Sequence, residues 1–399
     1  MGLTINQDKV TVDIADQLIK LCPFSAITYE NNKLDINSAC KLCKLCVKKG
    51  PEGVIQYNED NITSVINKDE WRGITVFANH DGEKLHDVTL ELLTKAKELA
   101  KITNHPVQAL VIGYNTKAFC DTLLTYGADF VYTYDDIRLK DFDIEIYANI
   151  FENYINEIKP SSILVGATNL GRSLAPRVAA RFKTGLTADC TVLEMKDNTD
   201  LVQIRPAFGG NIMAQIVCPN NRPQFCTVRY KIFSIGKKID NPNGKTVTLP
   251  LSEAFFKTNT TIKNVLDKPK ESDICDSNVI VAIGRGVKNE SDLEAAKILA
   301  DKLGASLACT RPLVESGAFD AKCQIGLSGK TVKPKLIITL GISGAIQFAA
   351  GMKNAECIIS VNTDRNAPIF EIAHYGIVGN ISEVIPLLIN KIEEAQKNV

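Results

Sequence analysis

The stretch KPKLIITLGISGAIQFAAGM (333–352) contains an apolar run, a glycine-containing turn and a helix-like segment in direct succession. The apolar run has the length and composition of a buried strand, and the turn separates it from residues with helical spacing. NVIVAIGRG (278–286) starts a similar unit, and SSILVGATNLG (161–171) starts another. Because repeated strand–turn–helix units build parallel sheets covered by helices, we expect an α/β fold.

Three regions of the chain differ in sequence texture. Residues 1–68 are rich in cysteine and contain AITYENNKLDI, a hairpin pattern with Asn31-Asn32 at its turn. Residues 69–262 and 263–399 each carry a series of alternating strand and helix patterns. We therefore expect a small α+β module followed by two α/β domains with these boundaries.

The composition is that of an ordinary globular protein. Of its 399 residues, 45% are hydrophobic and 23% are charged, and 46 basic residues balance 46 acidic ones. The lack of a basic stripe argues against nucleic acid as a partner. We find no secretion signal at the N-terminus and no apolar run near the roughly 20 residues that a membrane span needs. A cytoplasmic protein with its scattered cysteines reduced is expected.

Four cysteines form the most specific motif. Cys22 precedes a proline, and Cys40, Cys43 and Cys46 follow at a spacing of three. Bacterial two-cluster ferredoxins carry two C-x2-C-x2-C-x3-C-P runs, and the fourth cysteine of each run ligates the other cluster. By that rule these four residues are the complete ligand set of one [4Fe–4S] cluster.

The ligand positions of a second cluster are all vacant. Counting along both runs places its ligands at Val12, Ala15, Leu18 and Gly50, none of which is a cysteine. Loss of one whole set favours retention of a single cluster. A four-thiolate zinc site and a group of buried thiols are the alternatives, although structural zinc sites usually contain two C-x2-4-C pairs.

Lysines crowd the cysteine motif. They are Lys41, Lys44, Lys48 and Lys49. One interpretation is that they attract an acidic ferredoxin to the cluster. The other is a solvated basic face without a partner.

Two glycine turns in the C-terminal region are candidate anion sites. Gly341-Ile342-Ser343-Gly344-Ala345 and Gly284-Arg285-Gly286 each follow an apolar strand pattern, where backbone amides are available to an anion. Such glycines are also needed simply for the chain to turn. Neither turn has the G-x-G-x-x-G spacing of a dinucleotide fingerprint.

Several longer sequence segments, taken in order along the chain, resemble the α subunit of electron-transferring flavoproteins. These segments are GATNLGRSLAPRVAARFKTGLTADC (166–190), IGRGV (283–287), ACTRPLVESG (308–317), IGLSGK (325–330), LGISGAIQFAAGM (340–352) and VNTDRNAPIFEIAHYGIVGN (361–380). The resemblance covers about residues 71–399. With its cysteine module, the chain is similar to the α subunits of electron-bifurcating dehydrogenase complexes from anaerobes, such as the lactate dehydrogenase and caffeyl-CoA reductase kinds.

The resemblance implies three domain roles. Residues 1–68 would be a ferredoxin-like [4Fe–4S] module, 69–262 an adenine-nucleotide-hydrolase-like dimerisation domain, and 263–399 a doubly wound FAD-binding domain. For the middle domain, the absence of G-x-x-x-x-G-K-[ST] favours a scaffold over an independent nucleotide hydrolase.

FAD is the cofactor that the resemblance implies. Arg311 would lie beside the isoalloxazine ring and favour its anionic reduced form, and Ser328 would hydrogen-bond near N5. The full set of implied cofactor-binding residues is Arg285, Thr310, Arg311, Ile325, Gly326, Leu327, Ser328, Ser343, Gly344, Ala345, Ile346, Gln347, Phe348, Asn362 and Asn380.

Three of these positions depart from the family pattern. Phe348 replaces a common histidine, Leu327 a glutamine and Asn380 an aspartate. Loss of the histidine would remove one stabiliser of anionic flavin. A core aromatic is the alternative interpretation of Phe348.

The function implied is an electron-transfer subunit that relays electrons between a β-subunit flavin and NAD site, ferredoxin and a partner flavoprotein dehydrogenase of lactate or acyl-CoA type. One alternative is a non-bifurcating flavoprotein α subunit whose cluster is structural. The other is a nucleotide-binding regulatory protein with a four-cysteine zinc module.

Overall fold

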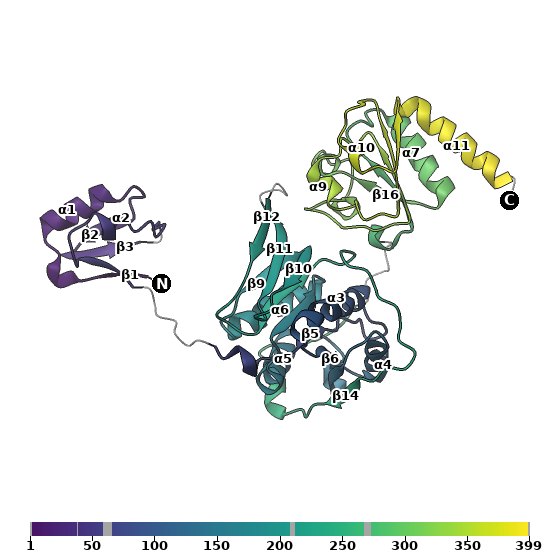
Figure 1. Cartoon of the computed structure of the whole chain (residues 1–399). Coiled ribbons are helices and arrows are strands. Elements are labelled where there is room, and N and C mark those ends of the chain that lie inside the picture. The colour runs from purple at the N-terminus through teal and green to yellow at the C-terminus, as the bar shows by residue number, and fades with distance from the viewer. Residues whose placement is uncertain (1, 38, 59–65, 208–211, 267–272, 398–399) are drawn as a thin grey trace. The chain divides into compact units, whose positions relative to one another are not determined.

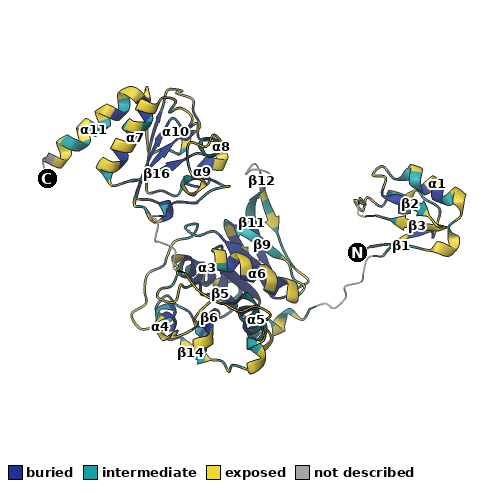
Figure 2. Ribbon diagram, turned by 180° about the vertical axis from the view of Figure 1, so that it is seen from behind, coloured by how far each residue is buried: buried dark blue, intermediate teal, exposed yellow. Residues whose placement is uncertain are grey.

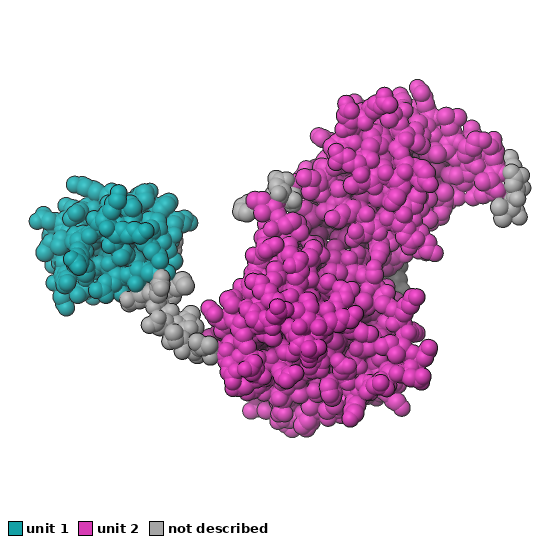
Figure 3. All heavy atoms as spheres, in the orientation of Figure 1, with its two compact units in different colours: residues 1–65 teal, residues 66–399 magenta. Residues whose placement is uncertain are grey.

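The computed structural model of the chain describes residues 2–37, 39–58, 66–207, 212–266 and 273–397. Two units, residues 1–65 and residues 66–399, make up the chain and are coloured separately in Figure 3. Figure 1 shows the helices and strands of each unit. Within the described ranges, no helix is both long and apolar enough to cross a membrane.

The N-terminal unit combines two small antiparallel sheets with helices. Strand β1 (Gly2–Ile5) pairs with β4 (Ile55–Asn58), and β2 (Ile27–Glu30) pairs with β3 (Lys33–Ile36). The hairpin expected between β2 and β3 is confirmed. Its turn residues have φ of 51° and 59°, the left-handed pair that asparagine tolerates in a two-residue turn.

Helix α1 (Val12–Leu21) occupies the segment in which a second cysteine run would lie. Thr11 caps the helix, because its side chain accepts the Ile14 amide at 3.4 Å. Ala15 and Leu18 have no exposed surface and belong to the hydrophobic core of this unit, together with Ile27, Leu34, Val54 and Ile55. Helix α2 (Leu45–Lys48) follows the cysteine loop.

The larger unit begins with a seven-stranded parallel sheet of order β14-β7-β6-β5-β8-β13-β9. Its strands are β5 (Ile74–Phe77), β6 (Val107–Gly113), β7 (Phe130–Asp135), β8 (Ser162–Gly166), β9 (Leu186–Cys190), β13 (Gln224–Val228) and β14 (Lys245–Thr248). The inner strands are apolar on both faces, as a sheet covered twice requires.

Two pairs of helices contribute to the two cores of this sheet. Helices α3 (Asp87–Thr103) and α4 (Lys117–Thr125) supply side chains to one core. Helices α5 (Ile144–Ile158) and α6 (Asn169–Arg181) supply the other. Figure 2 shows the buried strands between helices with exposed outer sides.

The residues between β9 and β13 form a three-stranded antiparallel sheet. It consists of β10 (Val192–Met195), β11 (Leu201–Ala207) and β12 (Ile212–Ile216). Together with β13, these strands make residues 201–233 rich in β structure. Ile212 and Met213 are about half exposed on β12.

The C-terminal region contains a five-stranded parallel sheet of order β16-β15-β17-β18-β19. Its strands are β15 (Val279–Ile283), β16 (Ser306–Cys309), β17 (Leu336–Leu340), β18 (Cys357–Asn362) and β19 (Tyr375–Val378). Helices α7 (Glu290–Leu303) and α11 (Ile381–Lys397) contribute to one core, and α9 (Ile346–Ala349) and α10 (Ile369–Ile372) to the other. The α/β class expected from the sequence is therefore confirmed.

Short helices complete the described structure. Helix α8 (Arg311–Glu315) follows β16. The 3-10 turns are η1 (Gln7–Lys9), η2 (Lys68–Glu70), η3 (Ile137–Leu139), η5 (Glu253–Phe256), η6 (Ile274–Asp276) and η7 (Ala321–Cys323).

Three local features depart from what the turn and capping residues of the sequence predict. Residues 236–250 contain Asn-Pro-Asn-Gly, which predicts a loop, but they include the edge strand β14, which takes its hydrogen bonds from β7 and lacks an apolar alternation. The cap of α3 is His86, whose Nδ1 accepts the Val88 amide at 3.2 Å, whereas Thr89 hydrogen-bonds Asn79 instead. Helix α7 begins after Asn289, although Ser291-Asp292 is the capping pattern that the sequence offers there.

Candidate cofactor sites

The predicted flavin-binding residues follow the strands of the C-terminal sheet at one edge. Arg285 comes two residues after β15, Thr310 and Arg311 follow β16, Ser343 follows β17, and Asn362 is the last residue of β18. Asn380 comes two residues after β19. Because all strands are parallel, these positions meet at the carboxyl edge of one sheet.

The strand order reverses between β15 and β17. From β15 the chain crosses through α7 to β16 on one side, and β17 lies on the other side. In open α/β sheets, the crevice at such a reversal is where ligands bind. The predicted site thus lies at the place that sheet topology favours.

Glycines bring the two central turns into backbone contact. A Cβ on Gly284 would lie 2.4 Å from the Gly341 carbonyl oxygen, and one on Gly286 would lie 2.6 Å from the Gly341 Cα. Both distances are too short for any side chain. These glycines are therefore required by close packing of the turns, which leaves the exposed Arg285 between two glycines free to extend outward.

The segment after β17 presents an irregular surface. Gly344 has φ of 89°, and a Cβ there would lie 2.1 Å from the Ile369 amide nitrogen, so only glycine fits. The exposed residues of the segment are Ser343, Ala345, Ile346 and Gln347. Helix α9 has only four residues, so its amides alone do not define an anion site.

Phe348 does not share this exposure. Its side chain is 4% exposed and belongs to the core that also contains Ile325, Met352 and Ile369. The core-aromatic interpretation of Phe348 is therefore the one that its burial supports.

A second loop lies beside this segment. The Leu327 amide donates to the Gln347 carbonyl oxygen at 2.9 Å, and Gly326 has φ of 138° at the same contact. Ile325 is buried, whereas Ser328 is exposed and its hydroxyl accepts a hydrogen bond from Gln324 Nε2 at 2.9 Å. Residues 325–328 therefore lie next to Gln347 in space. The sequence placed both in the flavin-binding set only because they resemble the family's motifs.

Arg311 carries a positive charge at the same edge. Its side chain is 65% exposed, and its Nε pairs with Glu315 Oε1 at 2.7 Å. An exposed pair of this kind contributes little to stability, so the guanidinium can turn toward a stronger anion at small cost. The preceding thiol, Cys309, is buried, and burial raises its pKa to about 12, which keeps it neutral.

The side chains of the two asparagines in the predicted set form hydrogen bonds with the backbone. Asn362 Nδ2 donates to the Ile342 carbonyl oxygen at 2.8 Å, which ties β18 to the β17 turn. Asn380 Oδ1 accepts the Ser382 amide at 3.3 Å and so caps α11. Sequence reasoning missed both of these roles and also missed Gln324, for which no motif gave a signal.

The four cysteines of the N-terminal unit line one small cavity. Phe24, Ile36 and Leu45 are among its apolar walls. Cys43 is exposed, and the other three thiols are half-buried. The set expected from spacing alone is therefore brought together by the fold.

Backbone amides are directed at two of these sulfur atoms. The Ala26 amide donates to Cys22 Sγ, and the Leu42 amide donates to Cys40 Sγ, both at 3.4 Å. Leu42 and Lys44 have φ of 52° and 59°, so the loop curls through left-handed conformations around the cavity. Amide donors to sulfur are a means by which proteins set the potential of iron–sulfur clusters.

Four thiolates can hold either one zinc ion or an iron–sulfur cluster. Around one zinc ion, Zn–S bonds of about 2.3 Å hold all four sulfurs close together. Within the described ranges, no three His, Cys, Asp or Glu side chains converge tightly enough to hold one ion. Burial, and then repulsion from Cys40 and Cys43, raises the pKa of Cys46.

A parallel sheet whose turn residues gather at its switch point belongs to the class of open α/β domains that bind ligands there. Comparisons with known proteins specify the class further. Residues 74–253 match the family described as "Electron transfer flavoprotein domain", and residues 273–353 match "Electron transfer flavoprotein FAD-binding domain".

Similar proteins agree with these matches. The chain is 55% identical to the "Lactate dehydrogenase (NAD(+),ferredoxin) subunit LctC" of Acetobacterium woodii, over 100% of this chain and 95% of that protein. It is 43% identical to the electron transfer flavoprotein subunit alpha of Megasphaera elsdenii, over 83% of this chain and 98% of that one. It is 36% identical to the "Acryloyl-CoA reductase electron transfer subunit beta" of Anaerotignum propionicum, over 82% and 97%.

The chain belongs to the electron transfer flavoprotein α-subunit family. Its C-terminal region is accordingly an FAD-binding domain. The alternative of a nucleotide-binding regulatory protein is therefore wrong.

Proposed function

We propose that this chain is the FAD- and [4Fe–4S]-containing electron-transfer subunit of a cytoplasmic, flavin-based electron-bifurcating or confurcating dehydrogenase complex. The observation that carries the proposal is the four-cysteine cavity on a flavoprotein α subunit. The domains proposed are a ferredoxin-like module over 1–68, a dimerisation domain over 69–262 and the FAD-binding domain over 263–399.

Residues at the carboxyl edge of the C-terminal sheet would hold the flavin. When bound, FAD supplies electron transfer in steps of one or two electrons. Arg311 places a mobile positive charge at this edge, and Arg285 places another. The Ser328 hydroxyl accepts from Gln324, so its own proton remains available to donate to a ring nitrogen. Residues 343–347 would wrap the anionic part through exposed backbone.

Cys22, Cys40, Cys43 and Cys46 would hold the cluster. When bound, such a cluster supplies one-electron transfer at low potential. The amides of Ala26 and Leu42 stabilise negative charge on two of the sulfurs. Cys43 is the exposed ligand, and this gives the electron a short path to a docked partner.

The relatives support the choice of complex. LctC matches the whole length of this chain, whereas the Megasphaera α subunit matches 83% of it. The remaining share is close to the size of the N-terminal unit, residues 1–65 of 399. An NAD-linked β subunit, a lactate- or acyl-CoA-type flavoprotein dehydrogenase and ferredoxin are the partners that we propose.

Replacement of Cys43 tests whether the cluster lies on the electron path. In the assembled complex, we expect Cys43→Ala to abolish ferredoxin-dependent turnover while NADH-dependent reduction of a dye at the flavin is retained. Cys357→Ala, which removes a half-buried thiol of the other unit, serves as the matched control. Full ferredoxin-dependent turnover in Cys43→Ala would instead show that the cluster is not on the electron path.

A further inference from the structure

Arg229 connects the seven-stranded sheet to the loop that carries Ser328. It follows β13 directly and so lies at the carboxyl edge of that sheet. Its Nη2 donates to the Leu327 carbonyl oxygen at 2.6 Å, which joins two places 98 residues apart in the sequence. The Arg229 side chain is only 17% exposed. Because water is largely excluded there, a hydrogen bond from a charged donor is strong.

This contact lies in the wall of a cavity of about 310 Å³. Arg229, Leu327 and Ile346 line the cavity, and residues of β10, β11 and β12 form another part of its wall. Leu327 and Ile346 belong to the set proposed to hold the flavin. Arg229 therefore borders the proposed flavin site although it belongs to the other sheet.

Hydrogen bonds hold the Ser328 loop at several points. The Leu327 amide donates to the Gln347 carbonyl oxygen at 2.9 Å, and Gln324 Nε2 donates to the Ser328 hydroxyl at 2.9 Å. Arg229 adds a bond to the peptide unit that joins Leu327 to Ser328. Because a peptide unit is planar, fixing its carbonyl also fixes the direction of the Ser328 amide and the place of the Ser328 Cα.

Asp189 lies beside the same guanidinium group. Its Oδ2 is 3.6 Å from Arg229 Nη2, and its Oδ1 is 3.0 Å from Arg172 Nη2. The Asp189 amide donates to Thr227 Oγ1 at 3.0 Å, which ties the carboxylate to β13. Asp189 thus faces two arginines, and Arg229 links it to the Leu327 carbonyl.

We propose that Arg229 is a positioning residue for the flavin. By fixing the peptide between Leu327 and Ser328, it holds the Ser328 hydroxyl where that group donates to a ring nitrogen. Its effect on the flavin passes through Ser328 and not through the charge of the guanidinium. The inference rests on the proposed function, in which Ser328 contacts the flavin.

Hydrogen exchange of the full-length chain without flavin tests the contact itself. Arg229→Ala should speed exchange in peptides that span residues 324–330 on the order of tenfold, because the loop loses a charge-assisted hydrogen bond. Arg229→Lys keeps a cationic donor and should restore part of the protection. Exchange in β5, at the centre of the sheet, should not change in either variant. Unchanged exchange of residues 324–330 in Arg229→Ala would overturn the proposal.

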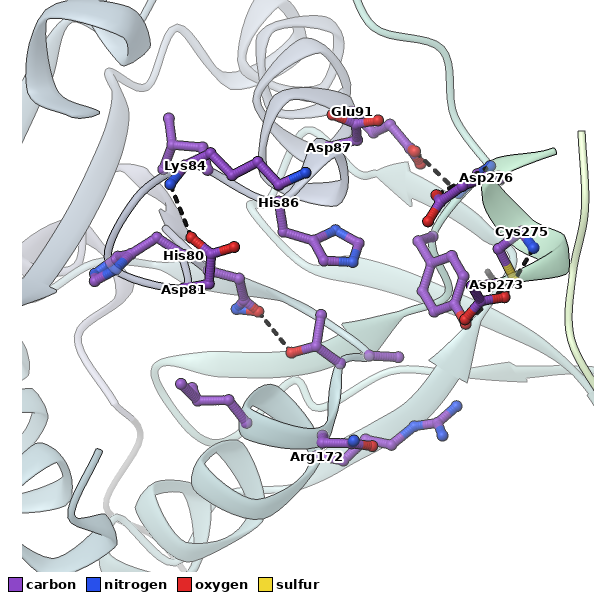
Figure 4. A pocket seen from close by; sticks show the side chains of 18 residues that line it. His80, Asp81, Lys84, His86, Asp87, Glu91, Arg172, Asp273, Cys275 and Asp276 are labelled. Atoms are coloured by element: carbon purple, nitrogen blue, oxygen red, sulfur yellow. Dashed lines mark hydrogen bonds and ion pairs between the residues drawn. The ribbon is translucent and has the colours of Figure 1, made fainter. Parts of the chain in front are cut away.

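Arg172→Ala is the matched control. This arginine pairs with the same carboxylate, but it extends from α6 and lines a different cavity, of about 480 Å³, together with Asn79 and His86 (Figure 4). Leu327 does not line that cavity. Exchange of residues 324–330 should therefore stay unchanged in Arg172→Ala. Equal effects of the two variants would assign the loop's order to the Asp189 ion pairs and would overturn the proposal.

The midpoint potential of the flavin bound to this chain, measured in the assembled complex, tests the second step. Ser328→Ala and Arg229→Ala should shift it in the same direction. The double variant should shift it no further than Ser328→Ala alone, because Arg229 acts through Ser328. Additive shifts would show that the guanidinium acts on the flavin directly and would overturn the positioning role.

The same measurement separates this inference from the proposed function. A shift in Ser328→Ala without a shift in Arg229→Ala would overturn the role of Arg229 alone. No shift in Ser328→Ala would overturn the flavin contact on which the inference rests, whatever the exchange rates of the loop.

Discussion

The N-terminal unit offers two equivalent places for a set of cysteine ligands, and they are filled in opposite ways. At one, residues 40–44 form an open loop with left-handed residues and an amide directed at sulfur. At the other, α1 is a regular capped helix whose inner face joins the core. The same small unit thus carries a sulfur-lined cavity and, where the other ligand set would lie, a packed hydrophobic core.

The vacant ligand positions meet in space. A Cβ on Gly50 would lie 2.8 Å from Leu18 Cδ2 and 2.2 Å from the Cys46 carbonyl oxygen. Leu18 therefore packs against the position from which the fourth ligand of a second cluster would come. Leu18 thus occupies the position where that cluster would lie, and its buried side chain enlarges the hydrophobic core of a small unit.

The largest expected effect comes from emptying this leucine position. Leu18→Ala should lower the free energy of unfolding of the N-terminal unit by about 2–5 kcal/mol, because a fully buried side chain leaves a cavity. Loss of cluster absorption in a denaturant titration measures it. Val12→Ala, at a residue 59% exposed on the same helix, should change the midpoint little. Equal midpoints for the two variants would contradict the role assigned to Leu18.

Adding a methyl group at the facing position should have a smaller effect. Gly50→Ala is expected to cost about 1–3 kcal/mol in the same titration, since the new Cβ overlaps Leu18 and a carbonyl oxygen. In the double variant, Leu18→Ala should relieve part of that cost, so the two effects are not additive. Strict additivity would show that the two positions do not touch.

The smallest expected effect concerns the lysines beside the cysteine loop. Lys48 and Lys49 are exposed, whereas Lys44 lies over the Tyr57 ring at 3.4 Å. Lys48→Glu with Lys49→Glu should slow ferredoxin association several-fold at low salt and weaken its salt dependence. The exposed pair Lys237→Glu and Lys238→Glu is the control. Unchanged kinetics would favour the solvated-face interpretation.

The cysteine spacing predicted that the four thiols lie together, and the strand–turn–helix segments predicted the α/β class. Both are short-range patterns, because the residues involved lie close together in the sequence. In the structure they correspond to the sulfur-lined cavity and to the turns at the carboxyl edge of the C-terminal sheet. The helix at 12–21 was not foreseen, because its apolar residues were considered only as missing ligands.

Long-range contacts account for most of what sequence could not supply. The cavity beside Asn79 joins loops near residues 80, 170 and 275, and no local motif links them. Asn362 and Asn380 were grouped with the flavin by resemblance, yet their side chains also hold turns together. Strand β14 depends on its pairing with β7 more than on its own composition.

Metal and sulfide analysis of the anaerobically purified chain decides whether its four N-terminal cysteines hold an iron–sulfur cluster. We expect about four iron atoms and four acid-labile sulfides per chain, both lost in Cys43→Ala and retained in Leu18→Ala. A chain that holds zinc without iron or sulfide would contradict it.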